Sequence, residues 1–405
     1  MLFLLKICIG IANFIYFFFK LLLPVKDKVV MISRQSNEVN SDFRLLGEKL
    51  EEQGHQVVYL CKTLDGGVDS GFMTKIKYGL HMFKQMYHLA TSKVAVIDSY
   101  CPTVSILKQR KSLTVIQIWH SIGTMKSFGY NIFGKAEASD ARLARAMHMH
   151  RNYTFACTAG EASKKYLALG FDIPIEKMKL FTLPRVDLLM DEEYAKEKRE
   201  EILRDYPVLS ERPNVIYAPT FRKDESGFEK AFQSLVEAFD FEKYNLVVKL
   251  HPLSKVSLKE EGDGKAGNAV DVGCDVEAGR AESAGNAGGA DNPRLIIDRK
   301  YSTFDMIFVG DKMISDYSCV VYEAGVRDMP LYFYNFDMEN YDDVRGFDID
   351  YRTLPGYTER DPVKLVEDLD KPYDMEYFRE FIHKYVANTK DCAAKLAAEV
   401  DRYME

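Results

Sequence analysis

Residues 314–330 read ISDYSCVVYEAGVRDMP, and this stretch is the most informative part of the chain. It closes an apolar run, residues 306–314, that predicts a buried strand. Residues 320–325 have the periodicity of a short buried helix, and Pro330 ends that helix before a second apolar run, LYFYNF. A strand, a helix and another strand in this order form the repeating unit of a parallel α/β sheet.

The turn between that strand and that helix carries groups suited to phosphate. Ser315, Asp316 and Ser318 are residue types that cap helix N-termini. Unpaired N–H groups and the positive end of the helix dipole favour an anion there, and Ser318 can add a hydroxyl. Glu323 follows one turn later, where a carboxylate could bind the two hydroxyls of a ribose. Two interpretations stand: a nucleotide-diphosphate pocket, or a capped core helix as in any α/β protein.

Apolar strands alternate with helical stretches on both sides of this region. The predicted strands are KVVMIS, QVVYL, KVAVIDS, TVIQIWH and YTFACT in the first half, and NVIYAPT, YNLVVKLHP, RLIID, MIFVGDKMIS and PLYFYNF in the second. This alternation is typical of βαβ units. Because 405 residues exceed one typical core, we expect two Rossmann-like domains facing each other across a cleft, in a GT-B-like α/β architecture.

Composition shifts set the expected boundaries. Residues 260–292 are rich in Gly, Ala, Asp and Glu, and lack the large apolar residues needed to offset the entropy of ordering, so we expect a flexible acidic insertion. The predicted parts are a membrane-associated helix (1–24), an N-terminal Rossmann-like acceptor domain (25–190), a connector (191–212), a C-terminal Rossmann-like donor domain (213–385) and a C-terminal helix (386–405).

Charge and cysteine usage exclude several classes. The net charge of −7 gives no global basic field, which argues against a nucleic-acid partner. Seven cysteines without CxxC pairs or a matching His cluster indicate a reducing compartment rather than a disulfide framework or a zinc site. The sequence contains no DxD-type carboxylate pair in a convincing setting, so we expect no essential metal ligand.

The N-terminal segment is almost wholly apolar. Residues 2–23 are long enough to span a bilayer. Lys6, Asn13 and Lys20 recur at intervals of seven and form a narrow polar seam. Two interpretations compete: a transmembrane signal anchor, or a helix in the interface whose lysines reach lipid headgroups. Residues 75–93 predict an amphipathic surface helix, which could make a second contact with anionic lipid.

Polar side chains follow several strands of the first half. His120 ends the strand TVIQIWH, at the edge where open α/β sheets bind ligands, and a histidine there can accept a proton. A structural histidine is the alternative. Arg185, in LPRVD, could bind an anion or form an Arg–Asp clasp at a domain hinge. Lys126 is a further candidate for an acceptor contact or a hinge.

The second half repeats this pattern. Thr220 and Arg222, in YAPTFR, place a hydroxyl and a guanidinium at a strand end, and both suit phosphate. His251 ends the next strand, and Arg345 lies in a later loop. We therefore predict a phosphorylated donor in the interdomain cleft. The predicted catalytic residues are His120 and His251, and the predicted donor contacts are Thr220, Arg222, Ser315, Asp316, Ser318, Glu323 and Arg345.

Taken in order, the motifs resemble a known family. IWHSIGTMKSFGY, LPRVDLL, YAPTFR, KLHP, ISDYSCVVYEAG and YDDVRGF are similar to the CDP-glycerol glycerophosphotransferases of teichoic acid synthesis, which include primases, polymerases and ribitol-phosphate enzymes. The matching segments run from Trp119 to Phe347. The resemblance implies a GT-B architecture, a CDP-glycerol or CDP-ribitol donor bound mainly by the C-terminal half, and peripheral attachment to the cytoplasmic face of a bacterial cell membrane.

Three positions depart from the family pattern. Ser121 stands where the family usually has Gly, Cys319 where it has Ser, and Glu323 where it commonly has Asp. The acidic insertion is also unusual. These departures bear on the identity of the substrate more than on the fold or the reaction class.

The resemblance implies a reaction without a cofactor. A polyol phosphate, glycerol phosphate foremost, would pass from the CDP-alcohol to a hydroxyl of a lipid-linked glycan or polyol-phosphate acceptor in wall or capsule synthesis, and CMP would leave. His120 would take the hydroxyl proton. A GT-B glycosyltransferase using a nucleotide-sugar and an inactive membrane-bound scaffold are the rival hypotheses. Formation of a homo-oligomer stays open.

Overall fold

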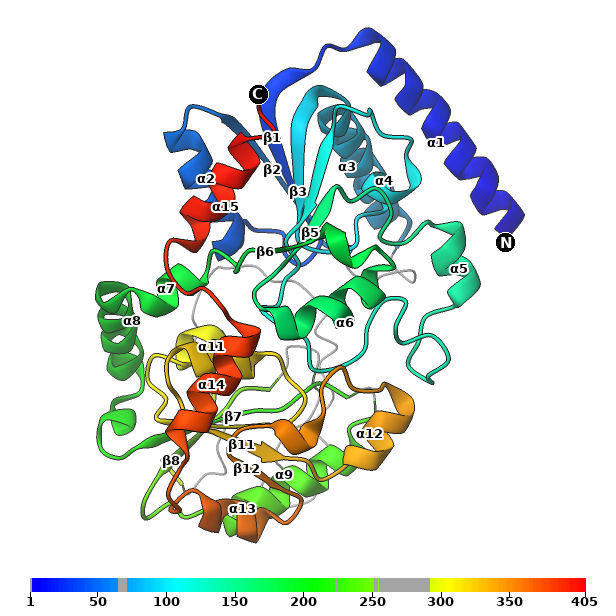
Figure 1. Ribbon diagram of the computed structural model, residues 1–405. Coiled ribbons are helices and arrows are strands. Elements are labelled where there is room, and N and C mark those ends of the chain that lie inside the picture. Colours follow the sequence, from blue (N-terminus) through cyan, green and yellow to red (C-terminus); the bar gives the residue numbers. More distant parts are fainter. Residues whose placement is uncertain (1, 65–70, 223, 251–253, 255–291) are drawn as a thin grey trace. The chain divides into compact units, whose positions relative to one another are not determined.

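The computed structural model describes residues 2–64, 71–222, 224–250, 254 and 292–405. It divides into two compact units (Figure 1). The first unit comprises Met1–Asp187, Val344–Asp348 and Lys384–Glu405, and the second comprises Leu188–Asp343 and Ile349–His383. His251 and residues 260–291 of the predicted acidic insertion lie outside the described residues.

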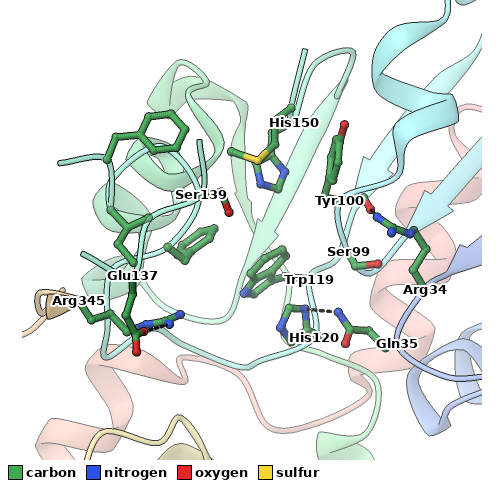
Figure 2. Close-up of a pocket in the computed structure, with 15 residues that line it drawn as sticks. Arg34, Gln35, Ser99, Tyr100, Trp119, His120, Glu137, Ser139, His150 and Arg345 are labelled. Atoms are coloured by element: carbon green, nitrogen blue, oxygen red, sulfur yellow. Dashed lines mark hydrogen bonds and ion pairs between the residues drawn. The ribbon is translucent and has the colours of Figure 1, made fainter. Parts of the chain in front are cut away.

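The first unit is built on a six-stranded parallel sheet in the order β2-β1-β3-β4-β5-β6. Its strands are β1 (Lys26–Ser33), β2 (Gln56–Cys61), β3 (Ser92–Ile97), β4 (Thr114–Gln117), β5 (Phe155–Thr158) and β6 (Met178–Leu180). The strand order reverses between β1 and β3. Residues that follow β1, β3 and β4, including Arg34, Ser99 and Trp119, gather at this end of the sheet (Figure 2).

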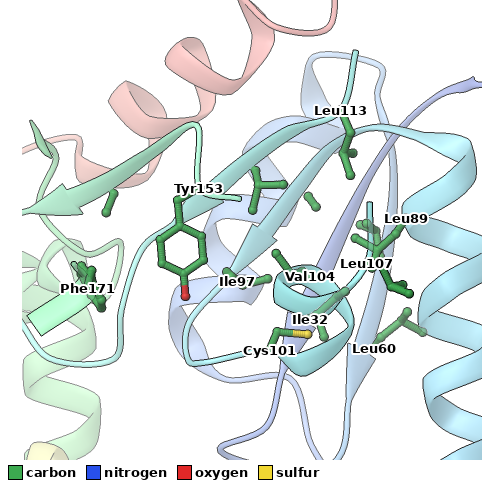
Figure 3. Close-up of a cluster of buried hydrophobic side chains, with 14 of the residues drawn as sticks. Ile32, Leu60, Leu89, Ile97, Cys101, Val104, Leu107, Leu113, Tyr153 and Phe171 are labelled. Carbon is green, nitrogen blue, oxygen red and sulfur yellow. The ribbon is translucent and has the colours of Figure 1, made fainter. Parts of the chain in front are cut away.

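Helices cover this sheet through apolar faces. The helices of the first unit are α1 (Leu2–Leu22), α2 (Ser41–Glu52), α3 (Phe72–Thr91), α4 (Pro102–Ile106), α5 (Ala141–Ala146), α6 (Glu161–Phe171) and α15 (Cys392–Asp401), with a 3-10 turn at Ile175–Lys177. The inner part of β1 is buried, as expected for a parallel strand covered on both faces. Ile32, Leu60, Leu89, Ile97 and Val104 meet in one core cluster (Figure 3).

The polar seam of α1 faces the protein. Asn13 Nδ2 donates to the carbonyl of Ile106 (2.9 Å), and its Oδ1 accepts from the amide of Lys108 (2.7 Å). Tyr16 donates to Gln109 (2.6 Å), and Lys20 Nζ donates to the Lys108 carbonyl (2.6 Å). Lys20 therefore donates one hydrogen bond inside the unit, whereas contact of the lysines with lipid headgroups was one of the two interpretations of this helix. The helix is long and apolar enough to cross a membrane by length and composition.

The second unit contains another six-stranded parallel sheet, in the order β12-β11-β10-β7-β8-β9. Its strands are β7 (Asn214–Ala218), β8 (Asn245–Val248), β9 (Leu295–Ile297), β10 (Lys312–Ser315), β11 (Leu331–Tyr334) and β12 (Tyr357–Glu359). This is the strand order of Rossmann folds, with the reversal between β7 and β10. Ser315 is in register with Ala218, so the turns after these two strands lie side by side.

Helices also cover the second sheet. They are α8 (Glu192–Asp205), α9 (Ser226–Ala238), α10 (Thr303–Met306), α11 (Val320–Val326) and α13 (Pro362–Asp368), with 3-10 turns at Pro207–Ser210 and Tyr351–Thr353. Phe228, Phe232 and Leu235 of α9 repeat at helical spacing and are buried in the core of this unit. Three helices run across unit boundaries in the sequence: α7 (Val186–Met190), α12 (Met338–Val344) and α14 (Met375–Tyr385).

The α/β prediction with two parallel sheets holds, with three differences in detail. The predicted strand over residues 306–315 is shorter, because residues 303–306 form α10 and β10 begins only at Lys312. Strands β6 and β12 were not predicted. The C-terminal helical sequence is divided: most of α14 belongs to the second unit and α15 to the first, where the carboxylate of Asp187 accepts from the amides of Cys392 (2.7 Å) and Ala393 (2.9 Å).

Candidate functional site

A cavity of about 540 Å³ opens at the carboxyl ends of β1, β3 and β4 in the first unit. Gln35 follows β1, Tyr100 follows β3 and His120 follows β4, and all three side chains line it (Figure 2). This is the point where the strand order reverses, and open α/β sheets bind ligands at such points. The predicted placement of His120 at a ligand-binding edge therefore agrees with the geometry.

The hydrogen bonding of His120 favours a proton acceptor. Its Nδ1 lies 3.1 Å from the carbonyl oxygen of Asp98 and 3.5 Å from the amide nitrogen of Gln35. The shorter contact is to a carbonyl, which can only accept, so we assign the proton to Nδ1. This leaves the lone pair on Nε2. The residue is exposed to the cavity, but protein surrounds the rest of the ring. This burial lowers the pKa of His120 to about 4, and the charges of Arg185 and Lys126 act in the same direction. The imidazole is neutral at neutral pH.

Trp119 holds the ring from one side. Its φ of 65° lies in the left-handed region, which is unusual for a bulky residue and concentrates at functional sites. The Trp119 amide donates to the Gln117 side chain (2.8 Å), which stabilises the turn. The Trp119 and His120 ring centroids are 4.1 Å apart, and Phe128 packs on the indole at 4.8 Å. The imidazole therefore has a fixed position beside the cavity.

Arg345 lies in the first unit, and its predicted location in the donor domain is wrong. Its guanidinium pairs with Glu137 (2.7 Å), and both line the His120 cavity (Figure 2). The cause is Asp348, whose carboxylate accepts from Thr124 (2.8 Å), Ser127 (2.9 Å) and Asn131 (2.7 Å). These bonds tie Val344–Asp348 to the loop that follows His120.

Arg185 positions the backbone of the His120 turn. Its guanidinium pairs with the buried carboxylate of Asp42 (2.9 Å) and donates to the carbonyl of His120 (2.7 Å). The Arg–Asp clasp was one of the two interpretations of Arg185, and Asp42 is the carboxylate that forms it here. Lys126 is bridged to Phe347 and contributes its charge to the surroundings of His120.

In the second unit, a buried ionic network occupies the carboxyl ends of β7 and β10. Asp316 accepts from the amides of Thr220 (2.8 Å) and Tyr317 (2.6 Å), and it pairs with Arg222 (2.9 Å). Arg222 also pairs with Asp337 (2.6 Å) and is only 7% exposed. We predicted Arg222 as a phosphate contact, whereas its guanidinium here is held by two carboxylates. Those two charges raise the pKa of Arg222 in spite of its burial.

The opening stretch of the sequence lies beside this network. Ser315 is fully buried, and its hydroxyl donates to the carbonyl of Ala218 (2.8 Å), which joins β10 to β7. Cys319 occupies the position before α11, and Ser318 is half-buried, with its hydroxyl 3.5 Å from the amide of Val320. Glu323 lies on the buried side of α11. Of these residues, Ser318 is the one that keeps a partly accessible hydroxyl.

Three buried polar side chains at or beside this edge have no hydrogen-bond partner among the described residues. They are the hydroxyl of Tyr217 within β7, the hydroxyl of Thr220 and the amide of Asn335, which follows β11. Thr220 and Asn335 are the two that lie beyond the strand ends. Buried polar groups are nearly always paired, so unpaired ones at a ligand-binding edge are candidates for ligand contacts. Thr220 was predicted. Asn335 and Asp337 were missed, although their position just after the run LYFY was a usable signal.

Two Rossmann-like units with reactive or hydrogen-bonding side chains at their switch points define a GT-B-like architecture. The chain belongs to the CDP-glycerol:poly(glycerophosphate) glycerophosphotransferase family, which it matches over residues 15–395. This confirms the predicted family, the α/β GT-B-like fold and the class of enzyme, a CDP-glycerol glycerophosphotransferase-like phosphotransferase. The glycosyltransferase alternative shares the fold without the family.

Individual relatives support this family assignment, and a solved structure supports the fold. The chain is 26% identical to a teichoic acid ribitol-phosphate primase of Bacillus spizizenii, over 98% of this chain and 96% of that protein. It is 27% identical to a teichoic acid glycerol-phosphate primase of the same organism, over 76% and 73%. The wall teichoic acid polymerase TagF has a similar fold, with a TM-score of 0.66 at 16% identity over 94% of this chain and 90% of TagF.

Proposed function

We propose that this protein transfers a polyol phosphate from a CDP-alcohol to a hydroxyl of a lipid-linked glycan or polyol-phosphate acceptor. The donor binds at the β7–β10 edge of the second unit, and the acceptor hydroxyl binds in the cavity of the first. The observation that carries this proposal is His120, a neutral imidazole with its tautomer fixed by Asp98 and its lone pair available at a switch point.

The chemistry is a balanced phosphoryl transfer. Nε2 of His120 accepts the proton of the acceptor hydroxyl, and the oxygen forms a bond to the β-phosphorus of the donor. The bond between that phosphorus and the bridging oxygen breaks, and CMP leaves with the electron pair. Phosphoryl transfer chiefly requires positioning and neutralisation of charge. Arg345 lines the same cavity as a pair with Glu137, and this ion pair offers hydrogen bonds to the acceptor rather than net positive charge.

Glycerol phosphate is the unit we predicted from the family resemblance. Ribitol phosphate is supported by a different observation, the similarity to a ribitol-phosphate primase along nearly the whole of both chains. The two donors differ only in the length of the polyol beyond the β-phosphate, so the proposed roles of the donor edge and of His120 are the same for both.

We further propose that α1 attaches the protein to the cytoplasmic face of the membrane. Its polar seam is bonded to residues 106–109, so this face is not available to a bilayer. The opposite face exposes large apolar side chains, among them Phe3, Leu4 and Phe14. A helix tied along its length to a folded unit lies in the interface rather than across the membrane. On α3, Phe72, Ile76, Leu80 and Phe83 form an exposed apolar stripe that adds a second contact.

A donor panel tests the proposal. The protein is incubated with a lipid-linked acceptor and CDP-glycerol, CDP-ribitol or a UDP-sugar, and both nucleotide release and product mass are measured. We expect CMP release and a mass gain of one or more polyol phosphates. His120→Ala should lower turnover by about two to four orders of magnitude, because general-base catalysis contributes that much.

His383→Asn is the matched control, since His383 is an exposed histidine on α14. It should leave turnover unchanged. UDP release without CMP release would replace the proposal with glycosyl transfer, and near-normal turnover of His120→Ala would remove His120 as the base.

A further inference from the structure

Three cavities of the first unit are neighbours along one strip. The first lies between α1 and α5, with a volume of about 590 Å³, and the second, of about 560 Å³, adjoins it. His148 and Arg145 line both. Met149 and His150 line the second cavity and the His120 cavity. Residues 148–150 therefore form a common wall that leads from α1 to the candidate base.

Positive charge gathers at the α1 end of this strip. Arg142 and Arg145 lie three residues apart on α5, which places them on one face, and both line the α1–α5 cavity with Lys6. Arg151 and Lys177 line the second cavity. Among the described residues, Lys6, Arg145 and Arg151 have no carboxylate within ion-pair distance, and Asp140 lies 3.6 Å from Arg142. Asp172 is the acidic residue of the second cavity.

The α1–α5 cavity combines these cations with apolar side chains. Leu2 and Ile9 of α1 and Ala146 of α5 complete its lining. A ligand that matches both parts is an anionic group joined to a hydrocarbon chain. A phosphate attached to a lipid has this chemistry, because phosphate oxygens accept strong hydrogen bonds from guanidinium groups while the chain packs on Leu2 and Ile9.

The wall between the cavities is held in a strained conformation. His148, His150 and Asn152 have φ values of 50°, 61° and 74°, all in the left-handed region. Such residues persist only where their surroundings enforce them, and they cluster at binding sites. The enforcing bonds are Asn152 Nδ2 to the carbonyls of Val104 (2.8 Å) and Leu107 (3.0 Å). His150 also bonds to the Tyr153 hydroxyl (2.8 Å).

We propose that the cluster Lys6, Arg142 and Arg145 binds the phosphate at the lipid end of the acceptor. The glycan or polyol-phosphate part of the acceptor, which carries the reacting hydroxyl, then runs along residues 148–150 to His120. This inference rests on the proposed function for the identity of the acceptor, but the binding site itself can be measured without turnover. The site commits to one ligand chemistry, a phosphate or diphosphate ester of a long-chain alcohol, rather than to bulk anionic phospholipid.

Vesicle binding tests the site directly. The full chain is sedimented with phosphatidylcholine vesicles, with the same vesicles containing a long-chain alkyl diphosphate, or with phosphatidylglycerol at matched charge. We expect the alkyl diphosphate to strengthen binding about tenfold over phosphatidylglycerol, which corresponds to one charge-assisted hydrogen-bond pair. The double variant Arg142→Gln/Arg145→Gln should lose this gain and keep its binding to phosphatidylcholine.

Arg44→Gln is the matched control, because Arg44 is an exposed arginine of the same unit that pairs with Glu48 on α2. It should behave like wild type. Equal binding to the two anionic vesicles, or an unchanged gain in the double variant, would overturn the proposal. Turnover with CDP-alcohol is measured on the same samples, so that failure of the proposed function is seen as absent CMP release whatever the vesicles show.

Discussion

The carboxyl ends of the two sheets present their charged groups in opposite ways. In the first unit, His120 faces a cavity and is neutral, and the Arg345–Glu137 pair lines the same cavity. In the second, Arg222 and Asp316 are buried against each other. Both edges are switch points in parallel sheets of six strands, so the strand topology does not cause the difference.

This difference distinguishes a residue suited to take part in the reaction from residues that hold a binding edge rigid. In the proposed reaction, the group that accepts the proton must keep a lone pair and face the substrate, and the His120 ring lines the cavity with Nδ1, rather than Nε2, bonded to the Asp98 carbonyl. A group that shapes a binding edge must be rigid, and the bonds of Arg222 to Asp316 and Asp337 supply that rigidity. What remains for a ligand at the second edge is the set of unpaired polar atoms on Thr220 and Asn335.

The largest effect on stability should come from removing the cation of the buried network formed by Arg222, Asp316 and Asp337. Replacing Arg222 with Met leaves the carboxylates of Asp316 and Asp337 without their cation. Because a buried charge that loses its partner is strongly destabilising, we expect the free energy of unfolding of the second unit to fall by about 3–5 kcal/mol. Denaturant unfolding followed by circular dichroism measures this.

The surface variant Arg212→Met supplies the comparison, since Arg212 pairs at 3.8 Å with the highly exposed Glu242. Its cost should be within about 1 kcal/mol. If Arg222→Met instead unfolded like wild type and lost only affinity for CDP-glycerol, Arg222 would be a donor contact, as predicted from the sequence, and the second edge would not be a closed framework.

Local sequence patterns predicted the strands but not the partners of the site residues. Apolar runs bounded by polar residues marked β1 to β5 and β7 to β11. The sequences of β6 (MKL) and β12 (YTE) contain no such run, whereas β9 (LII), which is equally short, does. Asp337 was overlooked because it lies 115 residues from Arg222, and nothing near Arg222 indicates a second carboxylate. Strand ends thus locate candidate residues, but long-range packing decides their roles.

Arg345 and the seam of α1 show the same limit. The loop that carries Arg345 joins the first unit because Asp348 bonds to Thr124, 224 residues away. Lys6, Asn13 and Lys20 are spaced seven residues apart, which predicted a polar face on α1. This spacing indicates that the face exists but not what it contacts. The carbonyl groups of residues 106–108 that receive it could not be inferred from the helix alone.

The environment of His120, at the edge of the first sheet, should determine how the rate depends on pH. Only neutral His120 can act as the base, and its pKa of about 4 lies below the ordinary value, so kcat/KM should hold from pH 8 to pH 5 and fall only near pH 4. A histidine with the ordinary pKa of about 6.5 would already lose about tenfold at pH 5.5. The measurement is kcat/KM for CMP release against pH. An acidic limb near pH 6.5 would mean that His120 is solvated like a surface histidine.

The smallest expected effect concerns Thr220, at the β7–β10 edge of the second unit. Thr220→Val keeps the shape of the side chain and removes a buried hydroxyl that has no partner among the described residues. Without ligand, the variant should be as stable as wild type or slightly more stable, because an unsatisfied polar group is lost. With CDP-glycerol or CDP-ribitol, affinity should fall about fivefold to tenfold, the value of one hydrogen bond. Calorimetric titration and thermal unfolding of the same samples measure the two effects.

Thr358→Val, on the exposed edge strand β12, should change neither affinity nor stability. Wild-type affinity in Thr220→Val would show that the hydroxyl does not contact the donor. Weaker binding without loss of stability would instead place the donor at the β7–β10 edge, since a framework residue would change both.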